Sequence, residues 1–114
     1  MMDISNKIFV CQNVIDMRKS IDGLSILVET SGFEIDVGSC FLFINKGGEK
    51  IKILVREYNG FVLLYKRLDR GKFHLKSNEN HQLILTNREA RWLLDGLDWS
   101  TLKIKKTGSK KVYF

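Results

Sequence analysis

Proline is absent from this chain of 114 residues, so glycine has to supply the tight turns of the backbone. Long hydrophobic runs are absent as well. The longest, such as residues 61–65, have about five residues, whereas roughly 20 are needed to cross a bilayer. The N-terminus shows no charged segment followed by a long hydrophobic one, which a secretory signal would have. We therefore predict a cytoplasmic protein that does not enter a membrane.

Cysteine and histidine are scarce, with two of each. Cys11 and Cys40 lie in apolar, strand-like segments, where a thiol usually behaves as a small buried hydrophobic group. No C-x-x-C pair or Cys/His cluster is present, and the spacing of His74 and His81 matches no known metal geometry. We predict reduced thiols, no metal site and no cofactor.

Common catalytic motifs are also missing, because the chain has no P-loop, G-x-G-x-x-G, G-x-S-x-G or H-E-x-x-H pattern. An alternative is a small nuclease in which Asp16, Asp69 and Asp98 would have to cluster, since phosphoryl transfer by two magnesium ions needs grouped carboxylates. Asp69, however, lies in a turn between Arg67 and Arg70, which favours a structural role. We expect a protein that is not an enzyme.

The positive charge that is present is concentrated in two segments of a chain whose net charge is +6. Residues 50–73 carry seven basic and two acidic side chains, and residues 100–114 carry five lysines and no acidic residue. The rest of the chain is therefore net negative. This distribution is typical of a surface that binds a polyanion, rather than of a generally basic protein.

Hydrophobic periodicity and turn residues predict a single α+β domain over residues 1–99, followed by a lysine-rich C-terminal tail over residues 100–114. We expect a mainly antiparallel sheet of about five or six strands with two helices. Asn59-Gly60 is a strong hairpin signal, and Thr86 with Glu89 forms a capping box that should begin the second helix. The expected strands are residues 7–11, 40–45, 50–56, 61–67, 73–76 and 81–85, and the expected helices are residues 17–30 or 20–30, and 87–95.

The hairpin predicted over residues 50–67 and the turn after it carry the candidate site, because alternation along the strands places basic side chains on a face that we expect to meet solvent. Lysine and arginine neutralise phosphates, and aromatic rings can stack on unpaired bases. The alternative interpretation is that these charges keep an exposed sheet edge from aggregating. The candidate nucleic-acid-binding residues are Lys50, Lys52, Arg56, Lys66, Arg67, Arg70 and Lys72.

Four motifs, in order along the chain, resemble one known family. They are D-M-R-K, I-K-I-L, Y-K-R-L-x-x-G-x-F and G-L-D-W, and they lie in the segments NVIDMRKSIDGLSILV, CFLFINKGGEKIKILVREYNGFVLLYKRLDRGKF and LLDGLDW. Together they resemble the accessory protein TnpB, also called Orf2-like, of the IS sixty-six family of bacterial insertion sequences, over about residues 7–99. The motif residues are Asp16, Met17, Arg18, Lys19, Tyr65, Gly71, Phe73 and Trp99.

The resemblance implies a small bacterial protein that is encoded beside a separate, larger transposase and is needed for efficient transposition without catalysing strand transfer. It implies the transposase of the same element and other accessory proteins as partners, and it carries over no active site. We hypothesise a non-catalytic accessory factor that binds DNA nonspecifically through the basic hairpin and the tail. The alternative is a protein-interaction module that docks on the transposase without direct contact to DNA.

Overall fold

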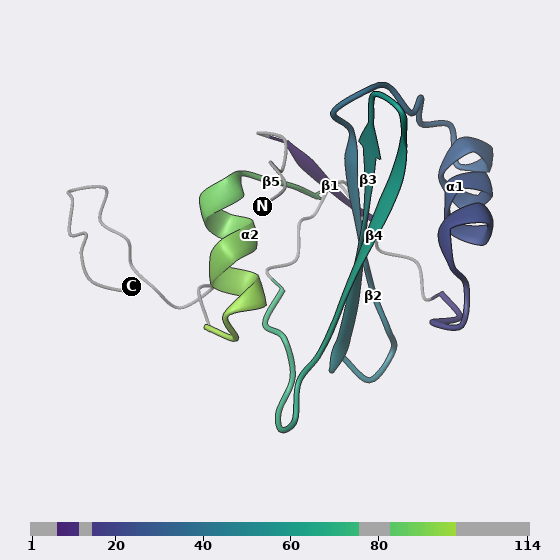
Figure 1. The fold of residues 1–114 in the computed structure, drawn as a ribbon. Helices are drawn as coiled ribbons and strands as arrows, with labels where there is room; N and C mark the ends of the chain where they lie inside the picture. Colours follow the sequence, from purple (N-terminus) through teal and green to yellow (C-terminus); the bar gives the residue numbers. More distant parts are fainter. Residues whose placement is uncertain (1–6, 12–14, 76–82, 98–114) are drawn as a thin grey trace.

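The computed structural model describes residues 7–11, 15–75 and 83–97, in which five strands form one sheet. The strand order is β4-β3-β2-β1-β5, and one helix covers each face of the sheet (Figure 1). This arrangement confirms the predicted α+β fold with two helices. The elements are β1 (Ile8–Cys11), α1 (Ile21–Thr30), β2 (Cys40–Ile44), β3 (Lys50–Glu57), β4 (Gly60–Arg67), β5 (Leu83–Leu85) and α2 (Asn87–Leu94).

The sheet combines a parallel unit with an antiparallel meander. β1 pairs in parallel with β2, whereas the β2–β3, β3–β4 and β1–β5 pairs are antiparallel. Adjacent parallel strands need a long crossover connection, and the segment containing α1 provides it. The predicted meander is therefore confirmed for β2, β3 and β4, whereas β1 joins the sheet through the parallel pair.

The two faces of the sheet hold separate hydrophobic clusters. On the α2 side, Ile8, Leu42 and Ile53 pack with the buried side chains of α2. On the α1 side, Phe41 and Leu54 pack with residues of α1. Because helices cover both faces, β2 is a continuous apolar run instead of an alternating one, and all its residues except the last are buried.

The helix ends follow their local chemistry. α1 begins after Ser20, the later of the two expected starts, whereas residues 17 and 18 form a turn. At the start of α2, Thr86 and Glu89 form the predicted capping box, in which each side chain bonds the backbone of the other. Gly96, with φ of 82°, ends α2, where its N–H donates to the Leu93 carbonyl and the next N–H donates to that of Trp92.

Two expectations about the backbone need correction. Residues 73–75 form no strand, because the Phe73 N–H donates to the Gly48 carbonyl at 2.8 Å while the Phe73 ring is buried in the α2-side cluster. The chain is thereby anchored beside the β2–β3 turn instead of running along β4. The β3–β4 hairpin is confirmed, but its two turn residues are Tyr58 and Asn59, and Gly60 already pairs with Glu57.

Candidate nucleic-acid interface

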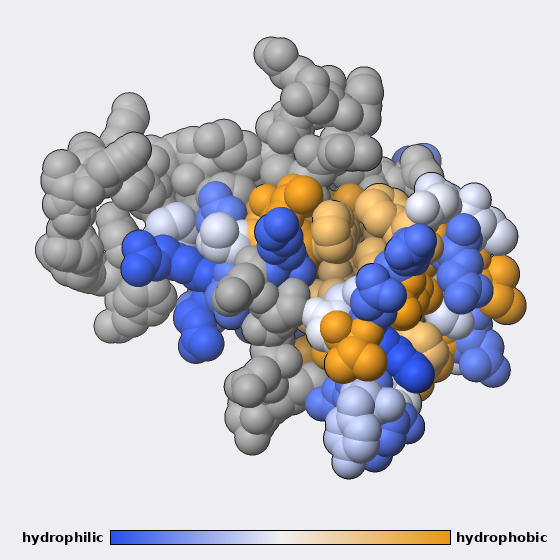
Figure 2. All heavy atoms as spheres, turned by 90° about the horizontal axis from the view of Figure 1, so that it is seen from above, coloured by the Kyte–Doolittle hydropathy of each residue, from blue (hydrophilic) through white to orange (hydrophobic). Residues whose placement is uncertain are grey.

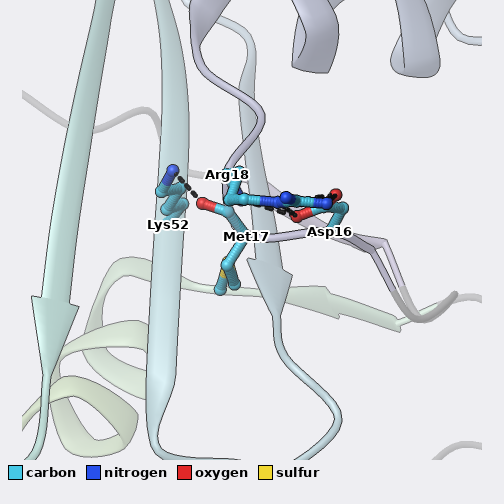
Figure 3. Close-up of polar contacts among 4 residues, drawn as sticks. All are labelled: Asp16, Met17, Arg18 and Lys52. Carbon is cyan, nitrogen blue, oxygen red and sulfur yellow. Dashed lines mark hydrogen bonds and ion pairs between the residues drawn. The ribbon is translucent and has the colours of Figure 1, made fainter.

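Lys52, near the start of β3, does not face solvent. Its side chain points toward α1 but is only 8% exposed. The ammonium donates to the carbonyl oxygen of Met17 at 2.5 Å (Figure 3). It also donates to the carbonyl oxygen of Lys19 at 2.8 Å. The expectation that Lys52 meets solvent is therefore wrong, because the turn that precedes α1 covers this part of β3.

That turn consists of residues 16–19, the D-M-R-K motif, and we call it the DMRK turn. Asp16 accepts hydrogen bonds from the Arg18 backbone N–H at 2.9 Å and from its guanidinium, with the shortest contact at 2.7 Å. The Lys19 N–H donates to the Asp16 carbonyl at 3.0 Å and closes the turn. The hydrogen bonds to Arg18 hold the pKa of the Asp16 carboxyl well below its usual range. Much of the charge of Arg18 is therefore balanced within the turn.

An aromatic side chain lies beside the buried ammonium. Tyr65 of β4 is the cross-strand partner of Lys52, and the Lys52 Nζ lies 5.3 Å from the centroid of its ring. Tyr65 as a whole remains 53% exposed. Cation–π attraction thus orients an accessible aromatic face on the α1 side of the sheet.

Two cations stand directly opposite each other next to this ring. Lys50 of β3 pairs with Arg67 of β4, two positions along each strand from the Lys52–Tyr65 pair. Side chains two apart on a strand share a face, so Lys50, Tyr65 and Arg67 form one surface on the α1 side, which we call the basic patch. Like charges that are directly opposed destabilise a sheet. Among the described residues, the side chains of Lys50 and Arg67 form no ion pair or hydrogen bond.

Glu49 partly compensates the basic patch. The amide of Asn45 donates to its carboxylate at 3.0 Å and is the main cause of its lowered pKa, to which the neighbouring charges of Lys50 and Lys72 contribute. One carboxylate near these cations leaves the surface with a positive surplus. The arrangement can therefore attract an anion from outside the fold.

The other candidate residues are distributed over different surfaces. Arg56 is half-buried near the far end of β3, with its guanidinium 4.8 Å from the centroid of the Phe61 ring. Lys66 points to the opposite face, where its Nζ donates to the Leu94 carbonyl at the end of α2 at 2.6 Å. Arg70 and Lys72 are exposed in the turn after β4. The seven predicted residues therefore do not form one surface.

The family-motif residues have different structural roles. Asp16, Met17, Arg18 and Lys19 form the DMRK turn, and Tyr65 belongs to the basic patch. Gly71, with φ of 80°, allows the turn after β4, and Phe73 packs in the α2-side core. The contact between the DMRK turn and Lys52 links positions more than 30 residues apart. It could not be predicted from the sequence, because no local pattern of residues indicates which distant segment a lysine will contact. Trp99 and the lysine-rich tail lie outside the described residues.

Three further observations concern chemistry and membranes. In the described ranges, no group of three or more His, Cys, Asp and Glu side chains could hold a metal ion. Of the three carboxylates that a nuclease would need to cluster, Asp16 and Asp69 are described, whereas Asp98 lies outside these ranges. His81, the second histidine of the chain, also lies outside them. Both cysteines are free thiols, as predicted. None of the helices in this part of the chain is long and apolar enough to span a bilayer.

Comparison with known proteins identifies relatives in one organism. The chain is 29% identical over 94 residues to "Uncharacterized protein y4hO" of Sinorhizobium fredii (strain NBRC 101917 / NGR234), which covers 82% of each chain. It is 28% identical over 100 residues to "Uncharacterized protein y4jC" of the same strain, covering 87% of this chain and 86% of the relative. No solved structure matches significantly. The family model "IS66 Orf2 like protein" matches residues 6–104, and the chain therefore belongs to the IS66 Orf2-like family of insertion-sequence proteins.

Proposed function

We propose that this protein acts in the bacterial cytoplasm as a non-catalytic accessory factor for insertion-sequence transposition and binds DNA nonspecifically. Membership of the IS66 Orf2-like family implies the accessory role in transposition. The observation that supports DNA binding is the directly opposed pair Lys50 and Arg67, beside the exposed ring of Tyr65. A pair of like charges that the described fold leaves unpaired is stabilised when a polyanion binds.

The chemistry of the basic patch fits a nucleic-acid backbone. Lys50 and Arg67 contact phosphates and release counterions, which gives affinity that is independent of sequence and falls with salt. Tyr65 offers a ring on which an unpaired base can stack. Arg70, Lys72 and the lysines of residues 100–114 add positive charge, whereas Lys52 serves the fold. The proposed binding is therefore electrostatic and nonspecific.

Paired variants test this proposal. We expect Lys50→Gln with Arg67→Gln to weaken binding to a fluorescent duplex between roughly 50 and 200 mM salt, and to reduce the slope of log affinity against log salt by about 2. Arg88→Gln with Arg91→Gln is the matched control, because both arginines are exposed on α2, on the opposite face of the sheet. Equal losses in the two double variants would contradict a localised interface, and no binding at the lowest salt would overturn DNA binding altogether.

A second candidate function is that of a module that docks on the separate transposase and contacts DNA only indirectly. It is favoured by exposed hydrophobic side chains, namely Ile26 on α1 and Val37 in the loop before β2, which are 58% and 63% exposed. Figure 2 shows hydrophobic atoms at the surface over the sheet and on the α1 side of the molecule, whereas the described atoms on the α2 side are mostly hydrophilic. Such side chains fit a protein partner better than a nucleic acid.

Co-purification separates the two functions. After nuclease treatment, a directly docked transposase remains bound to the protein, and Ile26→Lys with Val37→Lys should release it. A complex held together only by DNA dissociates under the nuclease, and the double variant then has no effect. Failure of the two proteins to associate in any mixture would exclude the docking module.

A further inference from the structure

We propose that two copies of this chain associate through the outer edges of their β4 strands, which pair antiparallel about a two-fold axis at Leu63. The two sheets then become one continuous sheet. This proposal concerns an interaction surface of the fold itself, and it does not depend on whether the basic patch binds DNA.

Within the described part of the chain, the outer edge of β4 has no strand partner. β4 is the terminal strand on its side of the sheet, and no other described strand pairs with its outer edge. In Figure 1 its ribbon passes in front of β2 and β3, with α1 and α2 to either side and no described element over it. Strands at sheet edges present unpaired N–H and C=O groups that can template another strand.

The hydrogen-bond pattern shows which groups point outward. The Arg56 N–H donates to the Ser39 carbonyl, so the even-numbered residues of β3 bond toward β2 and the odd-numbered ones toward β4. The register pairs each odd residue of β3 with an even residue of β4, for example Ile53 with Leu64. The backbone groups of the odd residues of β4 therefore face outward. These residues are Phe61, Leu63, Tyr65 and Arg67.

The side chains of β4 do not protect this edge. Soluble proteins usually shield an edge with a short strand, proline, or charged residues. β4 has eight residues, and positions 61–65 are all hydrophobic or aromatic, with charges only at Lys66 and Arg67. Leu64 and Tyr65 are 36% and 53% exposed. A long, apolar, uncovered edge of this kind is a pairing site.

The sequence of β4 is complementary to itself in one antiparallel register. With Leu63 opposite the partner's Leu63, Phe61 lies opposite the partner's Tyr65 and Val62 opposite the partner's Leu64. These pairs join outward-facing positions to each other and apolar side chains to apolar ones. Lys66 lies opposite the partner's Gly60, so that the cations of the two copies are at opposite ends of the paired segment. A second copy therefore fits the edge without opposing like charges, and the two-fold symmetry closes the assembly.

The same symmetry places the two α1 sides together. An axis perpendicular to the sheet keeps each face on its own side, so the basic patches of both copies point in one direction. The side chains of Lys50 and Arg67 remain on that face, because edge-to-edge pairing extends the sheet sideways and does not cover its faces. Dimer formation and DNA binding are thus compatible, and each can be measured without the other.

The mass of the full chain in solution tests the proposal. Analytical ultracentrifugation of nuclease-treated protein should give a dimer that persists at high salt, because the contact is backbone and apolar. Leu64→Lys places a charge on the exposed face of β4, and we expect loss of the dimer with an unchanged circular dichroism spectrum. Ile84→Lys is the matched control, since Ile84 is 46% exposed on β5, the strand at the other side of the sheet. This variant should remain dimeric.

A cysteine variant tests the register itself. Residues at the two-fold axis have Cα atoms about 5.5 Å apart in a hydrogen-bonded pair, which a disulfide can bridge. Oxidation of Leu63→Cys should therefore link two chains, whereas Ile84→Cys should not. A full chain that stays monomeric at all concentrations overturns the proposal. This holds even if a chain without residues 100–114 forms a dimer, because in the full chain the tail would then occupy the edge of β4. A dimer that tolerates Leu64→Lys and gives no Leu63→Cys link also overturns it.

Discussion

Lys52 shows how a charged residue in a strand can belong to the fold instead of the surface. Its four-carbon side chain carries the ammonium across the α1 side of β3 to two carbonyl groups of the DMRK turn. A buried ammonium is tolerated when its donors are satisfied in this way. The residue therefore joins a turn near the N-terminus to the central hairpin.

Replacing Lys52 with methionine keeps most of the side chain's bulk but removes the donor. We expect the free energy of unfolding to fall by about 1–3 kcal/mol, because the carbonyls of Met17 and Lys19 lose their partner. Urea denaturation measures this change. Lys50→Met is the matched control on the same strand and face, with an expected change within about 0.5 kcal/mol. Equal losses in both variants would show that the two hydrogen bonds do not stabilise the turn.

Cys11 should react slowly as a thiol. Burial raises its pKa from 9.0 to about 11, and only the thiolate is a good nucleophile. At pH 8 the native protein should therefore be alkylated by iodoacetamide roughly 100-fold more slowly than the unfolded chain, as follows from the difference in pKa. The rate is measured by mass spectrometry of the peptide that contains Cys11. Equal rates in the native and unfolded states would contradict the assignment.

The same pKa shift makes a contribution to stability that depends on pH. The folded state favours the neutral thiol of Cys11, so its contribution is complete below the unfolded pKa of 9.0 and disappears as the pH rises toward about 11. Cys11→Ala should remove this part of the alkaline loss of stability, measured as the difference between the two proteins from pH 8 to 11. If the free energy of unfolding changed with pH in the same way in both proteins, Cys11 would make no such contribution.

At the scale of elements, the two helices begin with different caps. The Thr86 hydroxyl accepts from the Glu89 N–H at 3.1 Å, whereas Ser20, at the N-cap of α1, makes no side-chain capping bond. We expect Thr86→Ala to lower the free energy of unfolding by about 1 kcal/mol and Ser20→Ala to lower it by less. Urea denaturation of the two variants side by side measures the difference. A larger loss from Ser20→Ala would contradict this interpretation of the caps.

The elements also differ in how much of their structure can be predicted from local sequence. α2 was predictable because its capping box and terminal glycine are local signals. Residues 73–76 resemble a strand, yet Phe73 is used to fill the α2-side core. Local pattern cannot distinguish a buried aromatic residue in a strand from one that anchors a loop, since both need only an apolar side chain.

At the scale of the whole molecule, β2 and β3 are the best protected strands, because they are the longest of the strands that are paired on both sides and covered on both faces. We expect their amides to exchange most slowly with solvent, by hydrogen exchange with mass spectrometry or NMR. The outward N–H groups of Phe61, Leu63 and Tyr65 should exchange rapidly in a monomer and slowly in the proposed dimer. Protection of these three amides that does not change on dilution to the monomer would contradict pairing through β4.

Several features of this protein were determined by the sequence itself. These features depend on neighbouring residues or on residue type, so the local sequence is enough to predict them. They are the α+β composition, the β3–β4 hairpin, the start of α2, the free thiols and the family motifs. Of the candidate site, the sequence identified Lys50, Tyr65 and Arg67 as members of a basic hairpin, but it treated Lys52 and Lys66 in the same way.

Only the tertiary structure decided which of those cations are available. Strand alternation assigns Lys50 and Lys52 to one face, but the DMRK turn covers Lys52 and leaves Lys50 half-exposed. The parallel pairing of β1 with β2, the contact between Lys66 and α2, and the terminal position of β4 among the described strands likewise depend on segments far apart in the chain. Burial and pairing depend on contacts between distant segments, and a local pattern of residues therefore cannot predict them.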